Sequence, residues 1–252
     1  MGFADLVLST NRKTCRSLNT GHSTCAPTSL CNKLCYGRYV GAKTAKQEGI
    51  HANVGPITKQ GNCYERNASL LHAHRSNEAW LERQAFRLKH ELDKDGLNNL
   101  RLCGMGDLTI GTCKIAVLLD TILKKHTWGF SKQHVLIKLL AKLCDDLNAP
   151  MQSRPYIIGS TDCSMTHVRV KQLIKATERL NGVPRLAYMT TNPGWVAKAE
   201  ISSLPMWWSK HITVVFGYHT SHCKTVVDHE LACPSTNGED ITCQVCRRCM
   251  GK

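Results

Sequence analysis

The sequence lacks any long apolar run, and it has few aromatic residues and few acids. Aromatic side chains make up 6% of its 252 residues, and no stretch approaches the roughly eighteen apolar residues that a membrane-spanning helix needs. The first residues, Met1 to Leu6, lack the basic region and apolar stretch of a secretory signal. Leu6 also stands where a myristoylation motif has Ser or Thr. These absences predict a protein of the cytoplasm that has no membrane partner.

Cysteine, by contrast, is abundant, with 14 residues. Disulfide bonds are disfavoured because the sequence carries no export signal and is long enough to build its own core. Some thiols are expected to be buried, such as Cys144 on the apolar face of a predicted helix. The others gather toward the two ends of the chain, which predicts at least one metal centre and favours an iron–sulfur cluster.

The C-terminal group of cysteines has the spacing of a metal site. Two overlapping C-x2-C pairs let neighbouring sulfurs turn toward one centre, and a fourth cysteine lies ten positions upstream. Arg247 and Arg248 lie between the two cysteines of the second pair and would offset the charge of four thiolates. Zinc and a four-iron cluster both accept four sulfur ligands, and the spacing does not decide between them. The predicted ligands are Cys233, Cys243, Cys246 and Cys249.

The N-terminal group is a loop that carries three cysteines within eleven residues, Cys25, Cys31 and Cys35. Three thiolates can hold three corners of a cubane and leave the fourth iron open to a substrate or cofactor. An open position distinguishes a chemical centre from a structural one. Cys15, ten residues before Cys25, is either a fourth ligand that closes this position or an ordinary thiol.

A third segment, Cys103-Gly104-Met105-Gly106-Asp107, follows a predicted strand. Glycines at the end of a strand let a ligand approach the backbone closely, and the Asp107 carboxylate can accept a hydrogen bond from an ammonium group. A turn followed by a helix cap explains the same residues without any ligand. The predicted cofactor-binding residues are Gly104, Gly106 and Asp107.

Strand and helix signals alternate through the middle of the chain. This alternation predicts an α/β fold with a parallel sheet and crossover helices, as a partial or full (β/α) barrel. The simplest organisation is one domain over residues 1–230 and a cysteine-rich metal-binding tail over 231–252. Residues 1–40 are predicted to be a loop around ligands or turns, and no element is predicted over 41–75. The predicted helices cover 77–95, 111–125, 131–147 and 165–180, and the predicted strands cover 97–103, 154–159, 185–190 and 211–216.

The net charge of +14 at pH 7 gives the chain a pI near 9.3. A solvated basic surface explains this charge, and so does a polyanionic partner, of which nucleic acid is the preferred one. If phosphates are bound, we expect a basic rim at the open end of the barrel, near the cysteine loop. Its candidate residues are Arg38, Arg66, Lys114 and Arg185.

Taken in order, these motifs resemble those of the phage GP88-type proteins. The opening motif runs from Thr24 to Tyr39 and contains the three loop cysteines. The resemblance covers most of the chain, and the order of the short motifs carries it. It implies a phage-encoded protein that acts in the host cytoplasm. The later motifs are Gly106-Asp107 after a strand, strands over 187–190 and 213–216, and Cys233-Pro234 with the closing cysteines.

That group is in turn similar to the radical S-adenosylmethionine enzymes, which carry a three-cysteine loop after the first strand of a partial (β/α) barrel and a Gly-Gly-Glu motif at the second. The resemblance implies that Cys25, Cys31 and Cys35 hold a 4Fe-4S cluster, and that the segment Gly104 to Asp107 binds S-adenosylmethionine. Two departures affect cofactor binding more than cluster binding. The spacing is C-x5-C-x3-C instead of C-x3-C-x2-C, and the motif has Asp for Glu with Met105 between its glycines.

Two classes of function follow. The first is an enzyme whose cluster donates an electron to cleave S-adenosylmethionine, with a redox partner protein, an auxiliary C-terminal centre, and a base or nucleotide as substrate. The second is a non-enzymatic zinc protein whose cysteine-rich ends stabilise a basic module for nucleic acid, or a structural component of an assembly. Iron content separates these two classes.

Overall fold

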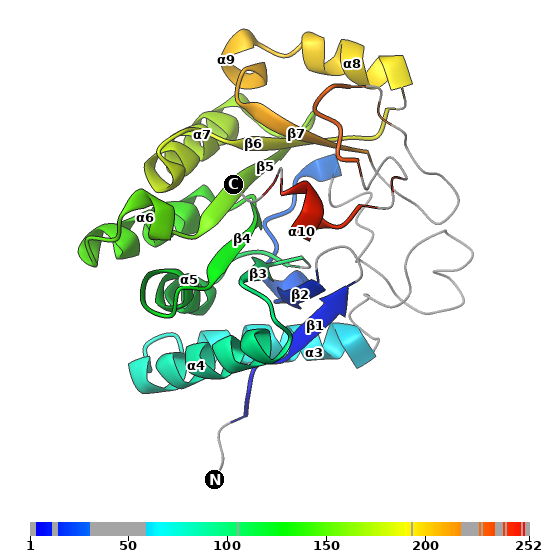
Figure 1. Cartoon of the computed structure of the whole chain (residues 1–252). Coiled ribbons are helices and arrows are strands. Elements are labelled where there is room, and N and C mark those ends of the chain that lie inside the picture. Colours follow the sequence, from blue (N-terminus) through cyan, green and yellow to red (C-terminus); the bar gives the residue numbers. More distant parts are fainter. Residues whose placement is uncertain are drawn as a thin grey trace.

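Seven strands form one sheet in the computed structural model, which describes residues 4–11, 15–30, 59–104, 106–192, 194–217, 227, 229–234, 239, 241–247 and 249. The strands are β1 (Leu8–Asn11), β2 (Cys15–Leu18), β3 (Asn99–Leu102), β4 (His126–Ser131), β5 (Tyr156–Asp162), β6 (Leu186–Thr190) and β7 (Ile212–Gly217). They lie in chain order, with β1 and β2 antiparallel and every neighbouring pair from β2 to β7 parallel (Figure 1). The predicted α/β class is therefore confirmed.

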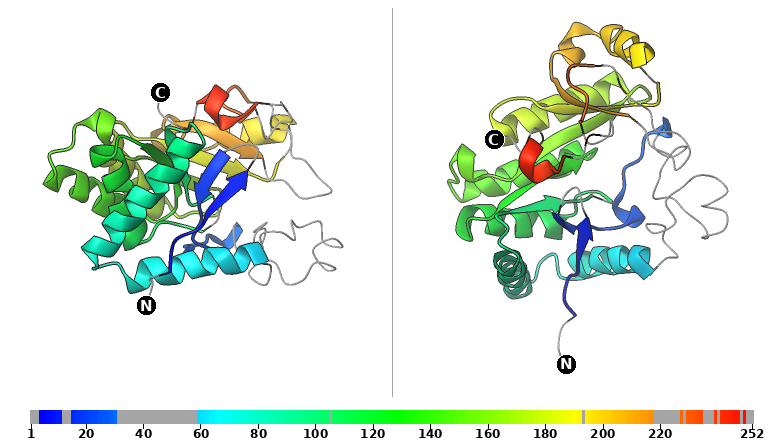
Figure 2. Two further views of the ribbon diagram at one scale, coloured as in Figure 1. Left: turned by 60° about the horizontal axis from the view of Figure 1, so that its bottom comes forward. Right: turned by 45° about the vertical axis from the view of Figure 1, so that its right-hand side comes forward.

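Helices make up most of the connections between the strands. They are α3 (Lys59–Ala73), α4 (Glu78–Lys94), α5 (Ile110–Val117), α6 (His134–Asp146), α7 (His167–Asn181), α8 (Gly194–Ser202), α9 (Met206–Ser209) and α10 (Cys243–Cys246), with the 3-10 turns η1 (His22–Thr24) and η4 (Met151–Ser153) and the π-helical segment η3 (Leu118–Ile122). Helices α4 to α7 lie on one side of the sheet and α10 lies on the other (Figures 1 and 2). Right-handed crossovers between sequential parallel neighbours all pass on the same face, which explains this arrangement. Within the described residues, no helix has the length and apolar composition to cross a membrane.

Both faces of the sheet are buried. On the helix face, Leu100 and Val215 pack with helix side chains in the larger apolar core. On the opposite face, which we call the tail face, Ile158 and Val214 pack with Cys233 from the C-terminal tail. Val214 and Val215 are 1% and 0% exposed, so the predicted strand at β7 is confirmed and is buried on both sides.

The most strongly patterned elements were predictable, and several weakly patterned ones were not. Helix α4 begins as expected at Asn77, whose side chain accepts a hydrogen bond of 3.0 Å from the Trp80 N–H. Strands β1 and β2 correct the prediction of a loop over 1–40, and α3 and β4 occupy segments where no element was predicted. Strands of four residues are too short to display an alternating pattern, and pairing with neighbours stabilises them instead.

The tail extends the far edge of the sheet. Val215 and Ala232 form a parallel bridge, in which the Cys233 N–H donates to the Val215 carbonyl over 2.9 Å. The strand order runs from β1 at one end to β7 at the other. Among the described residues, no pairing joins these two end strands to close a barrel.

Candidate functional site

Polar side chains converge where the carboxyl ends of the parallel strands meet, which we call the carboxyl edge. Asp107 follows β3, Lys132 follows β4, and Asp162 is the last residue of β5. All three are almost completely buried. Because parallel α/β sheets bind ligands beyond the carboxyl ends of their strands, this edge is the candidate site.

Asp107 is held by hydrogen bonds inside the protein. Its Oδ1 accepts from the Leu108 N–H (2.8 Å) and the Ser131 hydroxyl (2.5 Å), and its Oδ2 accepts from the Lys132 N–H (3.2 Å). Burial raises the pKa of this carboxyl group to about 6, although the hydrogen bonds oppose the shift. These contacts fit the turn-and-cap reading of the motif. Oδ2 accepts one bond and keeps a lone pair, so the predicted contact with a cofactor ammonium group stays a prediction.

The two glycines of the motif allow the N-terminal segment to approach closely. Gly106 has a φ of +87°, and a Cβ at this position would overlap the carbonyl oxygen of Gly21. A Cβ on Gly104 would lie 2.9 Å from Asn19 Oδ1. The glycines thus accommodate the chain's own loop, and Met105 lies outside the described residues.

The described part of the cysteine loop, residues 19–30, is fixed across the carboxyl edge. The Thr24 hydroxyl accepts from the Asp107 N–H over 2.8 Å, although the two residues are 83 positions apart. On either side of Cys25, the Thr24 carbonyl accepts from Gln133 Nε2 (2.7 Å) and the Ala26 carbonyl accepts from Arg169 Nη2 (2.6 Å). Cys25 is therefore held in place from both flanks by side chains that follow β4 and β5.

Of the three predicted cluster ligands, the structure describes only Cys25. Cys25 lies near Cys103, whose pKa is raised first by burial, then by the Asp107 charge, and to a smaller degree by Cys25. Cys31 and Cys35 lie outside the described residues. Cys15 begins β2, at the end of that strand opposite the carboxyl edge, which argues against it as the fourth ligand.

A buried ion pair holds the next part of the loop. Asp162 is 0% exposed, and its Oδ2 accepts from Lys132 Nζ (2.7 Å) and from the Thr28 hydroxyl (2.5 Å). Burial opposes ionisation of Asp162, but the Lys132 charge and the hydrogen bonds outweigh it and hold the pKa below its ordinary value. The sequence analysis missed this pair. Both residues stand at the carboxyl ends of strands, so a search for charged residues at these positions could have found them.

A second polar cluster lies beside this pair. The Glu200 carboxylate accepts from the Tyr188 hydroxyl (2.9 Å), the Thr190 hydroxyl (2.5 Å) and Asn192 Nδ2 (3.0 Å). Burial first, and then the Glu200 and Asp162 charges, raise the pKa of the exposed Cys163 thiol. The cluster extends the polar lining to the end of β6, and sequence reasoning missed it as well.

The predicted C-terminal ligands lie on the tail face. Cys233 is buried in an apolar cluster with Ile158 and Val214, and Cys249 packs against this cluster. The pKa of Cys249 is raised to about 12, first by burial and then by the charges of Cys233, Cys243 and Cys246. Among the described residues, however, no group of three or more Cys, His, Asp or Glu side chains is arranged to hold a metal ion.

The charges around these thiols differ from the expected ones. Arg247 is exposed, and Arg248 lies outside the described residues. The positive group that lowers the pKa of Cys249 is instead Arg101 of β3. Nothing in the tail motif points to a residue almost 150 positions earlier, so sequence reasoning could not find it.

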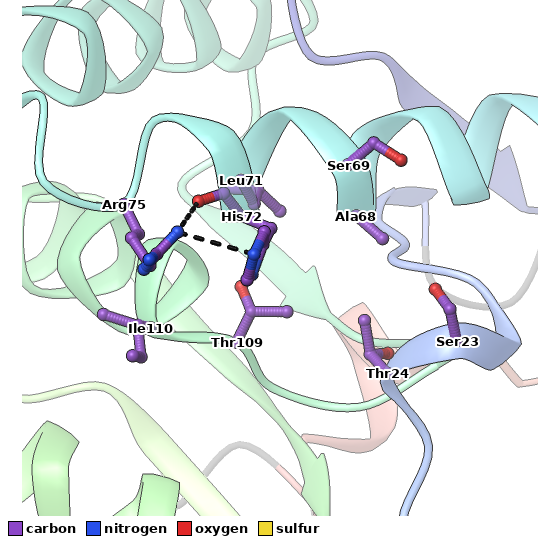
Figure 3. Close-up of a pocket in the computed structure, with 9 residues that line it drawn as sticks. All are labelled: Ser23, Thr24, Ala68, Ser69, Leu71, His72, Arg75, Thr109 and Ile110. Carbon is purple, nitrogen blue, oxygen red and sulfur yellow. Dashed lines mark hydrogen bonds between the residues drawn. The ribbon is translucent and has the colours of Figure 1, made fainter.

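A cavity of about 340 Å³ opens next to the cysteine loop, between α3, η1 and the start of α5 (Figure 3). Arg75 donates to the His72 carbonyl over 2.8 Å at one end of it. The side chains drawn in Figure 3 are mainly neutral and offer several hydroxyl groups. They are Ser23, Thr24, Ala68, Ser69, Leu71, His72, Arg75, Thr109 and Ile110.

The structure describes three of the four residues predicted to form a basic rim, and Arg185 does not lie at the expected edge. Arg185 precedes β6 and so lies at the amino end of that strand, opposite the carboxyl edge. Lys114 forms an ion pair with Glu78 of α4. Arg66 is on α3, and Arg38 lies outside the described residues. The sequence analysis erred for Arg185 because a strand signal alone does not say which strand end faces the site.

The chain matches no protein-family model, no curated protein and no solved structure. The interpretation of the site therefore depends on its residues and their geometry.

Proposed function

We propose that this protein is an iron–sulfur enzyme similar to the radical S-adenosylmethionine enzymes, with its reaction centre at the carboxyl edge of a partial (β/α) barrel. The observation that carries the proposal is the fixed position of Cys25. Its loop follows β2, crosses the carboxyl edge and bonds to the Gly106-Asp107 turn after β3. These are the relative positions that the resemblance implies for a cluster loop and a cofactor motif.

In this proposal, Cys25, Cys31 and Cys35 hold a 4Fe-4S cluster, which when bound supplies the electron that cleaves S-adenosylmethionine. The described residues prepare the site for it. Gln133 and Arg169 fix the backbone on both sides of Cys25, and preorganised ligands lose less entropy on binding. Asp107 contributes an acceptor with one lone pair not engaged by the hydrogen bonds described above, on Oδ2.

The cysteine spacing of the tail is the reason to propose a second metal centre there. Four thiols are a donor set suited to iron or zinc and unsuited to magnesium or calcium. In the proposal, Cys233, Cys243, Cys246 and Cys249 bind an auxiliary iron–sulfur cluster or a zinc ion, and binding draws the four sulfurs together.

The reaction can be tested with the anaerobically reconstituted protein. Calorimetry should detect binding of S-adenosylmethionine, and a strong reductant should then release methionine from it. Cys25→Ser should abolish methionine release, whereas Cys63→Ser, on α3, should leave it unchanged. If the iron-loaded wild type neither binds nor cleaves the cofactor, the radical-enzyme proposal is wrong.

The alternative is a zinc-binding basic protein that contacts nucleic acid. The tail thiols and the net charge of +14 are as compatible with this alternative as with the enzyme. It requires colourless protein with stoichiometric zinc, and binding to a defined oligonucleotide that weakens steeply with salt as counterions are released. Iron in place of zinc at both cysteine groups would exclude this alternative.

A further inference from the structure

The cavity beside the cysteine loop has the size of a small-molecule site. Its volume of about 340 Å³ falls within the range of ligand pockets, roughly 300–1,000 Å³. Thr24 lines the cavity, and the hydroxyl group of this residue accepts from the Asp107 N–H. The cavity therefore adjoins the candidate site at the carboxyl edge, and its lining defines the chemistry of a ligand.

One end of the cavity is positively charged. Arg75 stands there beside His72 and Ile110 (Figure 3). Its Nη1 donates to the His72 carbonyl over 2.8 Å and lies 3.5 Å from Nε2 of the His72 ring. Its Nε and Nη2 donate to no residue in the described part of the chain, and no described carboxylate pairs with it. A guanidinium group held through one nitrogen presents the other two as a fork that suits the oxygens of a phosphate or carboxylate.

The other end of the cavity offers hydrogen-bond acceptors. The Ser23 hydroxyl donates to the Glu65 carboxylate, and the Ser69 hydroxyl donates to the Glu65 carbonyl over 3.0 Å. A serine hydroxyl has one proton and two lone pairs, so both oxygens can still accept from a ligand. The charge of Glu65 disfavours an anion at this end. In Figure 3 the two serines lie on the right and Arg75 lies on the left.

The wall that joins the two ends is apolar. Ala68 and Leu71 of α3 belong to it, and both are buried. Such side chains suit the carbon atoms of a ligand and form no hydrogen bonds with it. The lining therefore asks for a small molecule with an anionic group at one end and hydrogen-bond donors at the other.

We propose that this cavity binds a sugar phosphate, alone or as the ribose phosphate of a mononucleotide. Arg75 binds the phosphate group, and hydroxyl groups of the sugar donate to Ser23 and Ser69. The site consists of described side chains and needs no metal, so the inference goes beyond the proposed iron–sulfur reaction. A ligand in the cavity lies next to the loop that carries Cys25.

Calorimetry on the full-length protein tests this inference with ribose 5-phosphate, AMP and inorganic phosphate. We expect ribose 5-phosphate to bind more tightly than inorganic phosphate, which cannot reach both ends of the cavity. Arg75→Gln should weaken ribose 5-phosphate binding by about 10- to 100-fold, since charge-assisted hydrogen bonds are lost. Ser69→Ala should weaken ribose 5-phosphate binding and leave that of inorganic phosphate unchanged. Tighter binding of AMP than of ribose 5-phosphate would assign the cavity to mononucleotides, and weaker binding would assign it to free sugar phosphates.

The matched control is Arg66→Gln. Arg66 is exposed like Arg75, stands on α3 and does not line the cavity, so this variant loses the same charge at a different place. Equal losses of affinity in the two Gln variants would show that net charge alone attracts the phosphate, and would overturn the inference. Ribose 5-phosphate binding that is absent, or no tighter than that of inorganic phosphate, would overturn it too. Since this binding requires no iron and methionine release does, failure of the inference is distinguishable from failure of the proposed reaction.

Discussion

Gly106 shows how a single backbone position brings two distant segments together. Its φ of +87° and the proximity of Gly21 leave no room for a side chain. Gly96 has a similar φ of +67°, but a Cβ there would meet no atom within 4 Å. Substitutions at these two positions therefore distinguish the cost of backbone strain from the cost of steric overlap.

We expect Gly106→Ala to cost about 2–4 kcal/mol of folding free energy, since it combines left-handed strain with overlap in a packed region. Gly96→Ala should cost about 1 kcal/mol, from strain alone. Urea unfolding of both variants measures the difference. Equal losses would show that the contact between Gly106 and the cysteine loop is not tight.

Asp107 makes the folded protein less stable as the pH rises, whereas most buried carboxylates that are paired with a positive charge have the opposite effect. Its pKa of about 6 in the folded protein exceeds the ordinary value of 3.8, so the folded state binds the proton more tightly than the unfolded state does. The favourable contribution is full below pH 4 and is lost as the pH rises through 6. Two pKa units correspond to roughly 3 kcal/mol at most.

Asp107→Asn removes this titration, while its Oδ1 can still accept from Ser131 and Leu108. We therefore expect the free energy of unfolding of the wild type to fall relative to that of Asp107→Asn between pH 4 and pH 7. Urea titrations of both proteins across this range give the difference. A difference that is constant or rises with pH would contradict the raised pKa.

At the scale of elements, periodicity explains which parts of the fold the sequence revealed. Helices α4, α6 and α7 each carry an apolar stripe, and β7 is a continuous apolar run, so their existence was predictable. Strand β2 is Cys-Arg-Ser-Leu, which has no such pattern. It forms because β1 and β3 pair with it on either side.

The tail is an element whose local order should depend on metal. In the metal-loaded wild type, we expect slow hydrogen exchange at the Cys233 N–H, which donates to Val215. Cys246→Ser should remove one metal equivalent and speed exchange there, because metal binding and local folding are coupled. The amides of β5 should not change.

Cys63→Ser provides the control for thiol replacement, since Cys63 lies on α3, away from the tail. Unchanged metal content in Cys246→Ser, with exchange at Cys233 as slow as in the wild type, would exclude the tail site.

At the scale of the whole molecule, both cysteine-bearing ends of the chain are joined to the same sheet, the loop by the bond of Thr24 to Asp107 and the tail by that of Cys233 to Val215. Spacing alone predicted Cys25 and the tail cysteines as metal ligands, because ligand motifs are local in sequence. The Lys132–Asp162 pair and Arg101 could not be identified in that way. Their roles arise from strand order and register, which place residues of β3, β4 and β5 side by side. For the same reason, the sequence did not reveal that Arg185 lies at the amino end of β6.

The central claim is that both cysteine groups bind metal and that at least one of them holds an iron–sulfur cluster. Iron, sulfide and zinc analysis of anaerobically purified wild type, Cys25→Ser and Cys246→Ser tests it most directly. We expect brown wild-type protein that absorbs near 400 nm. Cys25→Ser should lose one cluster's iron and sulfide, and Cys246→Ser should lose the metal of the tail alone. Colourless wild-type protein that contains no iron after anaerobic reconstitution would contradict the claim.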